Sequence, residues 1–90
     1  MPKLSSTASA ILTILNNINE LIVLSSDRQK AKEVMHALTV YADNKRFSLP
    51  SDKIESFYAI LIDSRPYTLT SLIKDIAEDI VTADTQRKNN

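Results

Sequence analysis

The stretch DSRPYTLTSLIKDIAEDI, residues 63–80, decides the fold class of this 90-residue chain. Pro66 interrupts it, and an apolar stripe with a helical period follows. The members of the stripe occupy positions i, i+3, i+4, i+7, i+8, i+11 and i+12: Leu69, Leu72, Ile73, Ile76, Ala77, Ile80 and Val81. Because such side chains share one face of a helix, the pattern predicts a helix over residues 68–83 with Thr68 as its cap. The polar residues 84–90 predict a flexible tail.

Three further apolar stripes predict helices over residues 6–24, 27–44 and 51–63. Ser26, followed by Gln29, fits a capping box for the second of these helices. Ser51, directly after Pro50, can cap the third. Four amphipathic helices with short connections predict an all-α fold. We expect an antiparallel four-helix bundle, or a closely related small helical fold, as a single domain over residues 1–83.

The chain contains no glycine. Glycine lets the backbone approach a phosphate closely, so a Walker loop and a dinucleotide fingerprint are excluded. Helices usually end on a glycine in the left-handed conformation, and here other residues must take that place. A glycine-free chain favours helices joined by short polar turns.

The composition limits the classes of function. Eleven Lys and Arg balance eleven Asp and Glu, which counts against nucleic-acid binding because that binding comes mostly from neutralised phosphates. There is no cysteine for a disulfide or a thiolate site. No apolar run approaches the about 20 residues of a membrane span, and the first residues carry no signal-peptide pattern. We expect a cytoplasmic protein without membrane insertion.

Catalytic chemistry has few candidates in this sequence. His36 is the single histidine. A zinc site needs about four ligands, which this chain cannot readily supply, and the serines cluster at helix starts where capping explains them. We therefore expect a non-enzymatic protein with no catalytic residue, no cofactor and no metal.

The opening stretch also allows a DNA-binding alternative. A helix, a break at Pro66 and a second amphipathic helix together have the layout of a helix-turn-helix regulator. The exposed side of the second helix would carry Lys74, Asp75, Glu78 and Asp79. This face is net negative and would be repelled by phosphates, so nucleic acid is not the expected partner.

Another alternative comes from the segment NKRFSLPSDKIESFYAIL, residues 44–61. It resembles the loop and proline-led helix of enterocin-A-type bacteriocin immunity proteins, over about a fifth of the 90-residue chain. Those proteins are small cytoplasmic antiparallel four-helix bundles. The resemblance implies a bundle of the same kind and, as an alternative function, immunity to a bacteriocin.

The leading hypothesis is a small regulatory protein that acts by binding another protein. The first helix is apolar on more than one side, so Leu12, Val23 and Leu24 would lie outside the core and form an interface. We expect a homodimer built on this helix. The acidic residues Asp75, Glu78 and Asp79, or the basic residues at the ends of the second helix, such as Arg28, would remain for a protein partner of unknown identity.

Overall fold

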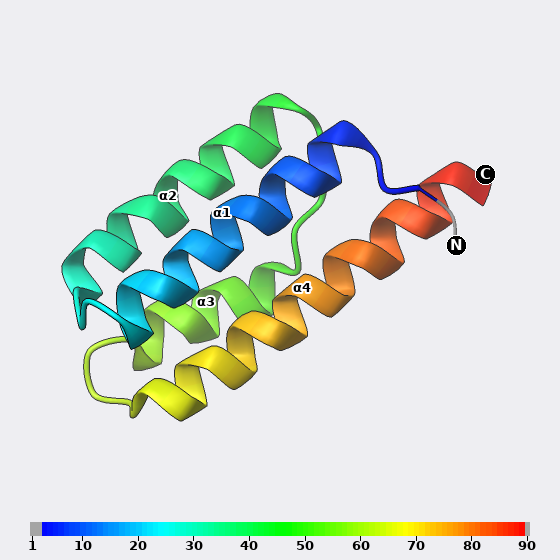
Figure 1. Cartoon of the computed structure of the whole chain (residues 1–90). Helices are drawn as coiled ribbons and strands as arrows, with labels where there is room; N and C mark the ends of the chain where they lie inside the picture. The colour runs from blue at the N-terminus through cyan, green and yellow to red at the C-terminus, as the bar shows by residue number, and fades with distance from the viewer. Residues whose placement is uncertain (1–2, 90) are drawn as a thin grey trace.

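The computed structural model describes residues 3–89 and contains four helices and no strand over that range (Figure 1). The helices are α1 (Ser6–Val23), α2 (Arg28–Asn44), α3 (Ser51–Ile60) and α4 (Pro66–Asn89). They make up 79% of the described residues, which confirms the predicted small all-α bundle.

Successive helices run in alternating directions, and α1 begins at the end of the bundle where α4 finishes (Figure 1). α1 packs against α2 and α4, while α3 packs against α4. The core collects one stripe from each helix; Leu38 of α2 and Ile73 of α4 are both buried. Lys32 is exposed on the opposite side of α2. The assignment of apolar and polar faces from the sequence period is therefore confirmed for these helices.

Three predicted helix caps were wrong. Asp27 caps α2, and its carboxylate accepts a hydrogen bond from the Lys30 N–H at 2.9 Å, whereas Ser26 was the expected cap. Pro50 takes the cap position of α3 without a side-chain bond, so Ser51 is already helical. α4 begins at Pro66, two residues before Thr68, because a proline in the first turn loses no helical hydrogen bond. α3 also ends earlier than predicted, at Ile60.

Two residues take the left-handed conformation that glycine usually supplies. Ser26 has φ 51° in the α1–α2 turn, and Arg46 has φ 55° just after α2. Around Arg46 the backbone forms a Schellman motif. The N–H of Arg46 donates to the Asp43 carbonyl at 3.0 Å, and that of Phe47 donates to the Ala42 carbonyl at 2.9 Å. A side chain at such a position costs about 1–2 kcal/mol, so these turns are held by their hydrogen bonds and neighbours.

Replacing either residue with glycine should therefore stabilise the protein. We expect Ser26→Gly and Arg46→Gly each to raise the free energy of unfolding by about 0.5–1 kcal/mol, the relief of backbone strain less the added freedom of the unfolded chain. Ser25→Gly is the matched control because Ser25 has no positive φ, and it should lower stability. Urea unfolding of the three variants gives the comparison. A loss of stability in both test variants would contradict this account of the turns.

The prediction of a flexible tail over residues 84–90 was wrong for residues 84–89, because α4 continues to Asn89; residue 90 lies outside the described residues. Asp84 is 2% exposed and reaches the start of α1. One carboxylate oxygen accepts the Ser5 N–H at 2.9 Å and the other accepts the Ser5 hydroxyl at 2.6 Å. The Ser5 hydroxyl oxygen in turn accepts the Ala8 N–H, which caps α1. Arg87 also lies over the ring of Phe47 at 5.2 Å. These contacts anchor the last turns, so they stay helical.

Removing the Asp84 carboxylate should destabilise the whole bundle. Asp84→Ala leaves both Ser5 donors without their acceptors, and we expect a loss of about 2–3 kcal/mol in the free energy of unfolding. Gln86→Ala, at an exposed position of the same turn, should change it by under about 0.5 kcal/mol. Chemical denaturation followed by circular dichroism measures both. Equal stability of Asp84→Ala and the wild type would show that the contact with Ser5 contributes nothing.

Arg28 makes hydrogen bonds between two segments at the opposite end of the bundle. Its Nη1 donates to the Leu61 carbonyl at 2.6 Å and also to the Ser64 carbonyl. These carbonyls follow the end of α3, where helical hydrogen bonds run out. From the sequence, Arg28 was expected to remain available to a protein partner. Instead it ties the start of α2 to the α3–α4 turn.

No helix within residues 3–89 combines the length and the apolar character needed to cross a bilayer.

Candidate functional site

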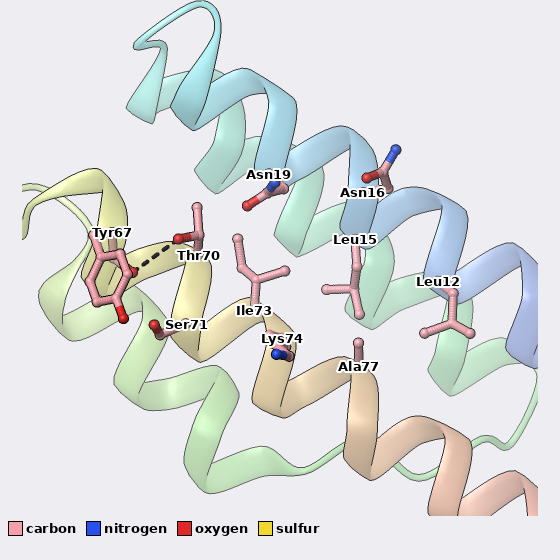
Figure 2. Close-up of a pocket in the computed structure, with 10 residues that line it drawn as sticks. All are labelled: Leu12, Leu15, Asn16, Asn19, Tyr67, Thr70, Ser71, Ile73, Lys74 and Ala77. Atoms are coloured by element: carbon pink, nitrogen blue, oxygen red, sulfur yellow. Dashed lines mark hydrogen bonds between the residues drawn. The ribbon is translucent and has the colours of Figure 1, made fainter.

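A groove with a volume of about 580 Å³ lies between α1 and α4. Figure 2 shows the side chains of both helices projecting into and around it. Its floor is apolar, since Leu15 and Ile73 are almost fully buried there. Its rim is polar, with the exposed residues Asn16, Ser71 and Lys74. An apolar floor inside a polar rim is the usual anatomy of a protein-binding surface.

The groove continues along α4 towards the C-terminal end of that helix. A second hollow, of about 580 Å³, shares Leu12, Lys74 and Ala77 with the first and extends it to Glu78 and Val81. Val81 is 39% exposed at this end. The two hollows together form one surface, here called the α1/α4 face.

On α1 the same face follows a helical stripe. Leu12, Asn16, Asn19 and Val23 stand at positions i, i+4, i+7 and i+11, so they share one side of the helix. Asn16 donates to the Glu20 carboxylate at 3.4 Å, while Val23 is 50% exposed. The stripe therefore has two amide side chains in its middle and an apolar side chain at each end.

Asn19 holds a polar atom that its surroundings leave unsatisfied. Its Oδ1 is buried and accepts no hydrogen bond from the described residues. Thr70, across the groove, has its hydroxyl proton engaged with the Tyr67 carbonyl of its own helix at 2.9 Å (Figure 2). A buried carbonyl oxygen without a donor costs about 1–3 kcal/mol. The isolated chain would fold more stably with an apolar residue here.

This cost gives a direct prediction for the isolated protein. Asn19→Leu should raise the free energy of unfolding by about 1 kcal/mol, because it removes the unsatisfied oxygen and extends the apolar floor. Asn16→Leu is the matched control, since the Asn16 side chain is exposed, and it should change stability by under about 0.5 kcal/mol. Thermal and urea unfolding test both variants. Destabilisation by Asn19→Leu would mean that the Asn19 amide is satisfied in solution.

The structure distributes the predicted interface residues over separate places. Leu12 is half-buried in the groove, and Val23 lies on the same stripe. Leu24 is 76% exposed beyond the end of α1, where it borders a smaller hollow of about 300 Å³ beside Asn17 and Glu20. Leu12 and Val23 therefore share one surface, and Leu24 belongs to the end of the bundle.

The acidic residues predicted as an interface lie on two different sides of α4. Asp79 forms an ion pair with Lys53 of α3 at 2.8 Å, with the two side chains 42 and 39% exposed. The hydrogen bond between the two side chains of this ion pair raises the pKa of Lys53, and burial lowers that pKa by a smaller amount. The negative charges of Asp79 and Asp75 raise the pKa of Lys53 further. An ion pair this exposed contributes little stability. Glu78 lies instead on the α1/α4 face, near Leu12.

The lone histidine lies away from that face. His36 is exposed on α2 and borders a hollow of about 520 Å³ that also touches Tyr58 of α3. Burial raises the pKa of Tyr58. Within the part of the chain that the structure describes, no group of three or more His, Cys, Asp and Glu side chains could hold a metal ion.

Sequence reasoning missed the central residues of the α1/α4 face: Asn19, Tyr67, Lys74 and Ala77. A signal for Asn19 was present, because Asn16 and Asn19 interrupt a strongly apolar helix at adjacent positions of one side. Tyr67 was taken for a residue that packs onto the start of the helix, but it is 81% exposed. Only the packing of α1 against α4 brings these side chains together.

No model of a protein family, no curated protein and no solved structure matches this chain. The assignment of a function therefore depends on the geometry of its surfaces.

Proposed function

We propose that this chain is a non-enzymatic interaction protein that binds another polypeptide with its α1/α4 face. One observation carries the proposal: a continuous groove with a buried apolar floor runs between the two longest helices and is bordered by exposed apolar side chains. Tyr67 at one end is 81% exposed, and Val23 and Val81 are 50 and 39% exposed. Exposed apolar groups in and around a groove gain free energy when a partner covers them.

The shape of the groove suits a helical partner. Two neighbouring helices leave a valley into which the apolar stripe of a third helix packs. Tyrosine at the edge of such a site often dominates binding, because it buries a large ring and keeps a polar tip in water. Tyr67 is placed at the edge in this way.

The polar groups of the face support binding better than catalysis. Tyr67 and Lys74 are the titratable residues among those lining the central groove, and no acidic or imidazole group faces them there. General acid–base chemistry needs a positioned proton donor and acceptor.

A photo-reactive amino acid placed at single positions tests this proposal in cells that naturally make the protein. Ser71 lies at the rim of the groove, and Glu55 is an exposed residue of α3 that serves as the matched control. We expect a covalent adduct with a polypeptide from position 71 and none from position 55. Ala77→Arg, which fills the groove, should remove the adduct.

An adduct of equal yield from both positions, or none from position 71, would contradict a binding role for the α1/α4 face. Circular dichroism of each variant checks that the substituted chain is folded.

A further inference from the structure

We propose that the polypeptide bound by the α1/α4 face is a second copy of this chain, an inference that rests on the proposed function. The two copies are related by a two-fold axis that crosses α4 near Ile76. α4 then runs antiparallel to α4 of the second copy. Lys74 of each copy faces Glu78 of the other copy.

The charges of the face carry this inference. Lys74 and Glu78 are the charged residues that line the two hollows, and both are exposed. Among the side chains described within residues 3–87, neither Lys74 nor Glu78 takes part in an ion pair, whereas Asp79 of the same helix is paired with Lys53. Lys74 and Glu78 have opposite signs and stand about 6 Å apart along the helix, at about 1.5 Å per residue.

Two opposite charges that stand one turn apart on a helix can pair with the same two charges on a second copy of that helix, when a two-fold rotation relates the two copies. The rotation reverses the helix, so each lysine meets a glutamate and two equivalent ion pairs form. An interface between identical chains requires this kind of self-complementarity.

The side chains around the axis fit the same arrangement. Ala77 is small and half-buried, so it allows the two α4 helices to approach closely. One turn further out, the rotation brings the 39%-exposed Val81 to the level of Ser71 of the other copy. It also brings the exposed Thr82 to the level of Thr70 of the other copy.

Charge reversal combined with mixing tests this pairing. Purified wild type at tens of micromolar should sediment at twice the 10.1 kDa mass of one chain. Lys74→Glu alone places glutamate opposite glutamate, and Glu78→Lys alone places lysine opposite lysine. Each should lower the association constant by about tenfold or more. An equimolar mixture of the two variants restores both ion pairs, so it should form a heterodimer with about the wild-type constant.

Lys32→Glu and Glu33→Lys, at exposed positions of α2 away from the face, are the matched controls and should leave the mass of the dimer unchanged. Urea unfolding of all four variants monitors folding. High salt should reduce the difference between the wild type and the two α4 variants, because it screens exposed ion pairs.

Two outcomes would overturn the second copy as the occupant: a wild type that sediments as a single 10.1 kDa chain, or α4 variants that remain dimeric alone and gain nothing on mixing. In either case, an adduct from position 71 with a different polypeptide would retain the protein-binding role and reject only the identity of the partner. A monomeric wild type with no adduct from position 71 would reject both.

Discussion

The carboxylate of Asp84 joins the two ends of the fold and sets the relation between α1 and α4. Its two oxygens accept the two donors of Ser5, and the Ser5 hydroxyl oxygen accepts the N–H of Ala8 in the first turn of α1. A carboxylate with both oxygens engaged in this way holds α1 at one position along α4. Arg28 performs a related task at the other end, where it supplies donors to carbonyls beyond α3. The α1/α4 groove lies between these two fixed ends.

The same constraint explains how a chain without glycine closes its turns. Ser26 and Arg46 occupy left-handed conformations at a steric cost, and Phe47 is 4% exposed directly after the second of them. Burial of Phe47, together with the Schellman hydrogen bonds and the contact of Arg87 with the ring, offsets the strain of the turn. The last helix thus supports the end of α2 as well as the start of α1. Local strain is sustained here by contacts that are distant in the sequence.

The two sides of α4 have different roles. Towards α3, Asp79 is paired with Lys53, and Asp75 adds to the field around that lysine. Towards α1, Lys74 and Glu78 have no ionic partner within the described residues and border an apolar groove with an unsatisfied amide oxygen. A protein retains such a surface at some cost in stability when binding recovers that cost. This contrast is the physical basis for the proposed binding role of the α1/α4 face.

The sequence by itself determined the number of helices, their apolar faces and most of the core, because the spacing of apolar residues depends only on the local geometry of a helix. Ile73 and Leu38 were assigned correctly on that basis, and Leu12 and Val23 were placed outside the core. The tertiary structure alone decided where α4 ends, since the partner of Asp84 is 79 positions away and local polarity favoured a frayed tail. It also decided which acidic residues are paired and which face the groove. The end of α4 and the surroundings of its acidic residues both depend on how each helix is rotated against its neighbours. Packing between segments that are far apart in the sequence sets that rotation, so no local sequence pattern predicts it.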